Sequence, residues 1–166
     1  MLKNTCLDKI LKSYENNFNI EKIDNDDEIF AAKAFFHSRG EKYILVKKAK
    51  IWAMETNEYV YFSTKEISTI EELSEIVQTA YVEGMKEIKP HSEHMCSTIS
   101  LIIINESISS ELVKDIKKIK KHKSFKFSFH GWMDLKVVAV DLSQNQIYTN
   151  AKANDMKKMY AQILKC

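Results

Sequence analysis

The stretch from Lys123 to Asn150 constrains the fold more than any other part of the chain, because it holds the densest strand signal. Phenylalanines alternate with polar residues over 125–129, and a period of two predicts a β-strand. Gly131 permits a kink, after which residues 135–142 continue as a strand and residues 147–149 return as a short one. We therefore expect the core to be built on this stretch, and any site to touch it.

The rest of the chain alternates between helical and strand periodicity. Apolar residues at three- and four-residue spacing predict helices at 2–17, 70–89, 110–122 and 152–164. Runs of β-branched and aromatic residues predict strands at 29–36, 43–54, 59–63 and 97–104, with turns at HSRGE and ETNE. A single α+β domain over residues 1–166 follows, with a mixed sheet of about five or six strands flanked by helices.

Composition limits the environment more than the function. Three cysteines, an odd number without a close pair, suit a reducing compartment. The longest apolar run, Leu101–Ile104, is far too short to span a membrane, and the N-terminus lacks the apolar region of a secretory signal. We therefore expect a cytoplasmic protein without a membrane partner. The net charge of +2 does not by itself indicate nucleic acid, and a lysine-rich composition is typical of low-GC bacterial genomes.

Candidate site residues lie beside the predicted turns. His37 and Arg39 share one turn, and Arg39, the chain's single arginine, is the residue type that a bidentate anion contact selects. Further histidines lie in PHSEH and before GWMD, where a tryptophan follows that is either a core residue or a stacking platform. The predicted polar patch comprises His37, Arg39, His91, His94, His130, Trp132, Asp134 and Lys136. Asp134 and Lys136, two residues apart, share one face of a regular strand.

Three interpretations of this patch remain open. The first is a non-catalytic binding or regulatory domain, without a cofactor, whose partner is an anionic small molecule or a nucleic acid. The second is a metal-dependent hydrolase or nuclease, in which His91 and His94 act with a carboxylate such as Glu93 or Asp134. The third is a structural homodimer, which predicts that Trp132 is buried between two chains.

Two resemblances bear on these interpretations. The segments FHSRGEKYILVKKAKIWA, PHSEHM and FSFHGWMDLKVVAVDL together resemble an uncharacterised family of bacterial domains of unknown function, from Phe35 to Asn150. The element order is also similar to that of restriction-endonuclease-like nucleases, which implies a degenerate member of that fold. That family places an E-x-K triplet on its third strand. Here the third position of the triplet that begins at Glu58 holds Val60 instead of a lysine, and Lys65 lies beyond the strand. The resemblance therefore implies the fold without the nuclease centre.

Overall fold

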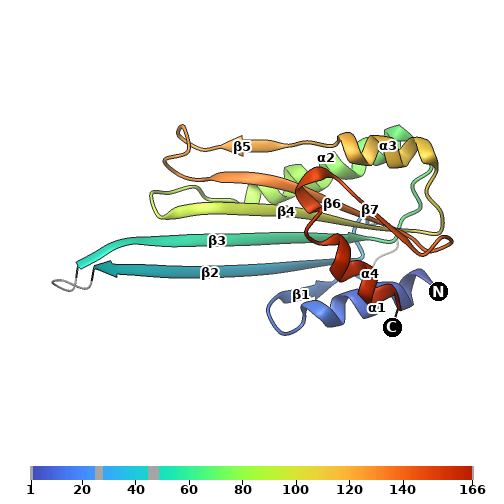
Figure 1. Ribbon diagram of the computed structural model, residues 1–166, viewed down its shortest axis with the longest axis horizontal. Helices are drawn as coiled ribbons and strands as arrows, with labels where there is room; N and C mark the ends of the chain where they lie inside the picture. Colours follow the sequence, from blue (N-terminus) through green and yellow to red (C-terminus); the bar gives the residue numbers. More distant parts are fainter. Residues whose placement is uncertain (1, 25–27, 45–48, 166) are drawn as a thin grey trace.

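The computed structural model describes residues 2–24, 28–44 and 49–165. A seven-stranded mixed sheet lies between two layers of helices (Figure 1). The strands are β1 (Asn19–Lys22), β2 (Ala32–Ile44), β3 (Ala49–Ser63), β4 (His94–Asn105), β5 (His122–Ser124), β6 (Trp132–Asp141) and β7 (Gln146–Thr149). The helices are α1 (Lys3–Tyr14), α2 (Ile70–Glu87), α3 (Ser110–Lys118), the short 3₁₀ helix η1 (Ala151–Ala153) and α4 (Lys157–Lys165). The α+β prediction is confirmed.

The strand order is β1-β2-β3-β4-β6, and β5 and β7 both pair with the outer edge of β6. β3, β4 and β6 run parallel to one another, and the remaining pairs are antiparallel. The central strand β4 carries the nearly all-apolar run Leu101–Ile104, which is buried on both faces as such a run predicts. The core is therefore built on β4 and β6 together.

Each face of the sheet has its own hydrophobic core. Odd-numbered residues of β6 such as Leu135 and Val137 pack with α2 and α3, and even-numbered residues such as Val138 and Val140 pack with α1 and α4. The helices cover only part of the second face, and β2 and β3 extend beyond them (Figure 1). Neighbouring residues along a strand therefore serve different faces, which decides how the predicted site residues are distributed.

The predicted division of residues 29–63 into three strands is wrong. Residues 37–41 and 55–58, expected as turns, continue β2 and β3 and pair with each other, with His37 opposite Asn57 and Arg39 opposite Glu55. Polar residues remain in the strands here because they face partners across the ladder. Part of the predicted strand 43–54 lies outside the described residues, at 45–48. The short strand β1 carries no clear strand pattern and was not predicted.

The predicted strand over 125–129 is also wrong. The residues from Phe125 to His130 form a compact turn between β5 and β6, and Lys126, Phe127 and Ser128 adopt left-handed backbone conformations. Backbone hydrogen bonds close the turn, from Phe125 to Gly131 and from His130 back to Phe125. β5 pairs with β6 only through residues 122–124, so no ladder extends the alternating pattern.

Two details at helix ends differ from expectation. The spacing of Ser68 and Glu71 also fits a capping box, but the capping box of α2 is formed one residue later, by Thr69 and Glu72. Asn150 precedes the last helical segment, as a capping residue would, but its side chain fills the gap between β5 and β7 on the edge of β6. Its side chain accepts a hydrogen bond from the Val137 amide and donates to the carbonyls of Leu135 and Ile119. The final helix is divided into η1 and α4.

Candidate functional site

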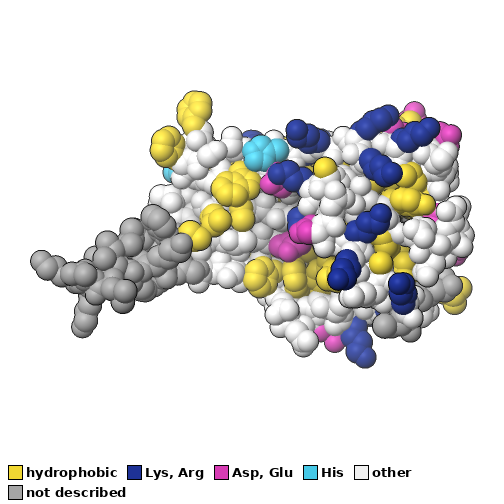
Figure 2. Space-filling model, viewed as in Figure 1, with side chains coloured by type: hydrophobic (Ala, Val, Ile, Leu, Met, Phe, Trp, Pro, Cys, Tyr) yellow, Lys and Arg dark blue, Asp and Glu magenta, His cyan; other side chains and the backbone are white. Residues whose placement is uncertain are grey.

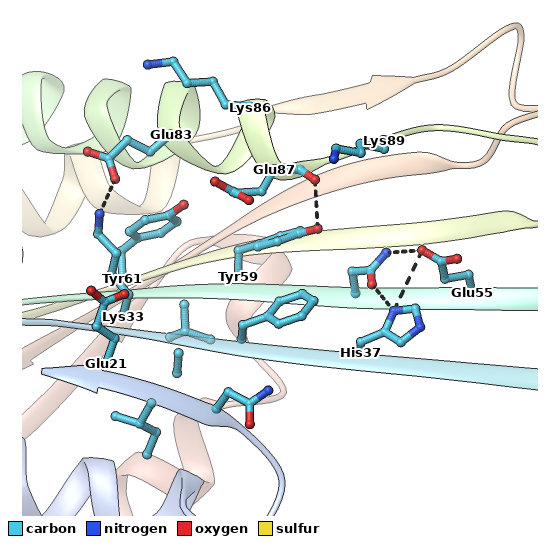
Figure 3. Close-up of a pocket in the computed structure, with 16 residues that line it drawn as sticks. Glu21, Lys33, His37, Glu55, Tyr59, Tyr61, Glu83, Lys86, Glu87 and Lys89 are labelled. Carbon is cyan, nitrogen blue, oxygen red and sulfur yellow. Dashed lines mark hydrogen bonds and ion pairs between the residues drawn. The ribbon is translucent and has the colours of Figure 1, made fainter.

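A groove of about 820 Å³ lies between α2 and strands β1, β2 and β3 (Figure 3). Alternate residues of β2 and β3 point into it, and the C-terminal half of α2 forms its other wall. The residues whose side chains carry the chemistry of the groove are Glu21, Lys33, Phe35, His37, Glu55, Asn57, Tyr59, Tyr61, Glu83, Lys86, Glu87 and Lys89.

Aromatic rings form the floor of the groove. The rings of Phe35 and Tyr59 stack across β2 and β3, with centroids 5.1 Å apart and planes inclined by 25°. The Tyr59 hydroxyl donates a 3.2 Å hydrogen bond to the Glu87 carbonyl, which ties the strand to the end of α2. Tyr61, two residues further along β3, extends the same aromatic surface. A flat or apolar part of a ligand can therefore rest on this floor.

Carboxylates on α2 place negative charge along one wall of the groove. Glu83 and Glu87 lie four residues apart on α2, and Glu83 faces the strands, whereas Figure 3 shows the Lys86 amine directed away from them. Burial, followed by the charge of Glu87, raises the pKa of Tyr59 to about 12. The pKa of Tyr61 is raised more than that of Tyr59, first by burial and then by the charges of Glu83 and Glu87. Both tyrosine hydroxyls therefore sense the same negative field from α2.

Lys33 shows what this environment accepts. Its ammonium lies 2.8 Å from the Glu83 carboxylate and 5.8 Å from the centre of the Tyr61 ring. The Phe30 ring centre is at a similar distance, 5.9 Å. An ammonium group held between a carboxylate and aromatic faces is a favourable arrangement, because ion pairing and cation–π attraction act together.

At one end of the groove two histidines meet one carboxylate. His91 Nε2 lies 3.0 Å from one oxygen of Glu55, and His37 Nδ1 lies 3.8 Å from the other. Asn57 links the group, since its amide donates to Glu55 at 3.1 Å and its oxygen lies 2.6 Å from His37 Nδ1. Burial raises the pKa of Glu55, but the hydrogen bonds from Asn57 and His91 and the nearby histidine charges outweigh it, so the net pKa is lowered.

Arg39 is also engaged. Its guanidinium lies 2.5 Å from the Glu93 carboxylate, on the same side of the sheet as His37 and His91. The four predicted residues His37, Arg39, His91 and His94 thus lie near one another. The first three face a carboxylate, so their positive charge is balanced by the protein itself. The anion contact predicted for Arg39 stays a prediction.

His94 has a structural position. It is buried, and its Nδ1 lies 2.6 Å from the carbonyl oxygen of His130, which can only accept a hydrogen bond. Nδ1 therefore carries the proton, and Nε2 accepts the Ser97 hydroxyl at 2.8 Å. Because both ring nitrogens are occupied, His94 has no lone pair to offer a metal ion. It fastens the turn that carries His130 to the start of β4.

Three of the four remaining predicted residues lie on the opposite face of the sheet, and the fourth, His130, ends the turn that leads into β6. Trp132, Asp134 and Lys136 alternate on β6 and point to the side of α1 and α4, and Trp132 is half-buried. Asp134 faces His122 at 2.8 Å and Lys152 at 3.0 Å, and these partners lower its pKa against the effect of burial. Lys136 bonds Asp155 of the last helical segment at 2.8 Å. The predicted patch is thus divided between two faces.

The groove residues on β3 and α2 were missed by the sequence interpretation. A signal exists: Lys33, Phe35 and His37 alternate on one strand, and Asn57, Tyr59 and Tyr61 alternate on its neighbour. The predicted turn at 55–58 hid it, because it separated Glu55 and Asn57 from the aromatic residues of the same strand. Glu58, also missed, points to the other face, where burial raises its pKa despite a hydrogen bond from Ser100.

The described residues hold neither a metal-binding cluster nor a membrane-spanning helix. Within residues 2–24, 28–44 and 49–165, no three His, Cys, Asp or Glu side chains are placed to hold one metal ion. No helix of that part of the chain is both long and apolar enough to cross a bilayer.

Comparison with known proteins gives a family and no activity. Neither the curated proteins nor the solved structures contain a significant match. The resemblance to restriction-endonuclease-like nucleases therefore stays a prediction. One family model matches almost the whole chain, residues 3–162, and it describes a domain of unknown function. The predicted resemblance to an uncharacterised domain family is thereby confirmed, and the chain belongs to the family of the domain of unknown function DUF8052.

Proposed function

We propose that this domain is a non-catalytic binding module, and that the groove beside α2 holds a small ligand with a protonated amine next to an apolar or aromatic part. The observation that carries the proposal is the position of Lys33, whose ammonium lies between the Glu83 carboxylate and the ring of Tyr61 in the same groove, with the Phe30 ring next to it. A ligand amine beside Glu87 would repeat this arrangement over the Phe35–Tyr59 floor.

The charges of the groove support a cation over an anion. Among the described residues, the carboxylates of Glu21 and Glu87 have no ion-pair partner. Of the described lysines that line the groove, Lys33 is paired with Glu83 and the Lys86 amine points away (Figure 3), which leaves Lys89 as an unpaired ammonium. The two neutral tyrosine hydroxyls add acceptors without adding positive charge. An anionic ligand, as predicted from the sequence, would here meet carboxylates.

The hydrogen bonds that already hold Glu55 and His37 favour a binding role over a catalytic one. Glu55 already accepts hydrogen bonds from Asn57 and His91, and its lowered pKa keeps it ionised rather than poised to donate a proton. His37 is held by Asn57 at its Nδ1. These groups stabilise one another, and a ligand in the groove would contact the aromatic floor and the α2 carboxylates instead.

Calorimetric titration and thermal-shift measurements with matched probes test the proposal. Phenethylammonium and spermidine should bind and raise the melting temperature, whereas 3-phenylpropionate, which carries the opposite charge on a similar ring, should not. Glu87→Gln should weaken phenethylammonium binding about two- to fivefold, the effect of one partly screened charge. Glu75→Gln, an exposed carboxylate on the same helix outside the groove, is the control. Binding of the anion in preference to the amines would refute the proposal.

A further inference from the structure

The turn between β5 and β6 presents two aromatic side chains to solvent. Phe127 is 96% exposed and Phe129 is 81% exposed, and no other large apolar side chain of the described chain is as exposed. The hydrophobic side chains that protrude at the top left of Figure 2 lie where Figure 1 places this turn. Full exposure of two phenylalanines leaves apolar surface in water that a binding partner could cover.

The turn holds these rings in a fixed arrangement. Lys126, Phe127 and Ser128 are left-handed, a conformation that costs about 1–2 kcal/mol per residue for L-amino acids. Hydrogen bonds within the turn, from Phe129 to Lys126 and from Gly131 to Ser128, maintain it. His94 fastens its end to β4 through the His130 carbonyl. The two rings are therefore exposed on a backbone that is itself held in place by hydrogen bonds.

The segment that leads from α3 through β5 into the turn is positively charged, and Lys123 and Lys126 are its lysines at the turn itself. No acidic residue occurs from 116 to 133, and this segment contains six lysines: Lys117, Lys118, Lys120, Lys121, Lys123 and Lys126. Lys117, Lys120, Lys123 and Lys126 have no ion-pair partner within the described chain. Further lysine side chains gather over α3 and α4, at the other end of β5 from the turn (Figures 1 and 2). The charge of a partner for this surface is therefore negative.

We propose that the β5–β6 turn binds single-stranded nucleic acid, with Phe127 and Phe129 stacking on bases and the lysines contacting phosphates. Aromatic rings with adjacent lysines supply the two interactions by which single strands are bound without sequence preference. Stacking requires rings held at fixed positions, which the left-handed turn provides, and requires bases that are not already stacked in a duplex. Trp132, the half-buried first residue of β6, pairs with Ser124 of β5 at the base of the turn.

Fluorescence anisotropy of labelled dT15 and rU15 with the full chain at 50 mM salt tests this proposal. Phe127→Ala and Phe129→Ala should each weaken binding at least about fivefold, and Val82→Ala, an exposed apolar residue of α2, should have no effect. Lys123→Gln/Lys126→Gln should make the slope of log K against log salt less negative by about 1.4, from about 0.7 per phosphate contact. Lys9→Gln/Lys12→Gln removes the same charge from α1 and should leave the slope unchanged.

Each other outcome would overturn the proposal. No wild-type binding to either oligonucleotide, equal loss in the control variants, or tighter binding to a DNA duplex would each exclude it. Binding to vesicles with anionic lipid that depends on Phe127 and Phe129, without oligonucleotide binding, would assign the surface to a membrane instead. Because both rings are exposed, all variants should retain the wild-type melting temperature, which confirms that any loss of binding is not loss of folding.

Discussion

Asn150 offers the sharpest test of how the sheet is held together. Its side chain is fully buried and replaces a strand between β5 and β7 by bonding the Val137 amide and the carbonyls of Leu135 and Ile119 at 2.9–3.1 Å. Asn150→Ala removes all three hydrogen bonds. The Val137 amide and the Leu135 carbonyl are then buried without side-chain partners, whereas the Ile119 carbonyl belongs to a residue that is partly open to water.

The magnitude follows from the two buried groups. An unsatisfied buried donor or acceptor costs about 1–3 kcal/mol, so Asn150→Ala should lower the free energy of unfolding by about 3 kcal/mol. For a chain of this size that corresponds to roughly 6–12 °C in melting temperature. Urea denaturation monitored by circular dichroism and fluorescence measures the change. Asn154→Ala, which loses one hydrogen bond from Thr149 at an exposed site, should cost about 1 kcal/mol or less.

Asn150→Asp tests the direction in which the stability of the variant should change with pH. The ionised carboxylate would face the carbonyl oxygens of Leu135 and Ile119, whereas the protonated form can donate to one of them. The pKa of this aspartate is therefore higher in the folded than in the unfolded state. Its contribution is retained below the unfolded-state pKa and lost as pH rises through the folded one, so the variant's deficit should be smaller at low pH. An Asn150→Ala protein within 1 kcal/mol of wild type, or an Asp variant with a pH-independent deficit, would refute the reasoning.

Two further predictions concern the loop and the histidine cluster. Gly131→Ala should destabilise the protein by about 2–4 kcal/mol in thermal unfolding, because Gly131 has a φ of +76° and an added Cβ would lie 2.1 Å from the Met95 carbonyl oxygen. Ser128→Gly, at another left-handed position of the same turn, should instead be neutral or stabilising by up to about 1 kcal/mol, and a loss there would contradict the strain argument. Because the pKa of Glu55 is lowered in the folded state, its stabilisation is present above the unfolded-state pKa and lost as pH falls through the folded one. Urea midpoints of wild type and Glu55→Gln should therefore converge between pH 6 and pH 3, and a constant gap would exclude the proposed hydrogen-bonded carboxylate.

Sequence periodicity identified the elements that are stabilised locally or buried on both faces. The helix over 70–89 carries its own apolar stripe and capping residues, and the apolar run of β4 fits only a central strand. Alternation failed at 125–129, because a period of two describes a strand only when a partner strand is present to pair with it. There the chain instead closes on itself through the His94 and Gly131 contacts, which join residues distant in sequence.

The candidate site was only partly predictable for a related reason. Each of His37, Arg39 and His91 was identified, and they lie close together, but their carboxylate partners Glu55 and Glu93 decide their charge environment. Those pairings depend on the β2–β3 register and on the approach of residues 91–93 to β3, which no local pattern specifies. Trp132, Asp134 and Lys136 belong to the opposite face, because residue parity along β6 is fixed by the sheet.

The way β6 is bordered determines how this sheet can associate with other chains. Along its outer edge, two short strands and the Asn150 side chain occupy successive positions, so within the described residues no long run of free backbone groups is left for an incoming strand. On the opposite edge, β1 pairs with only Ala32–Phe35 of β2. Edge-to-edge aggregation, or the deliberate addition of a β-strand peptide, should therefore take place along β2 and not along β6.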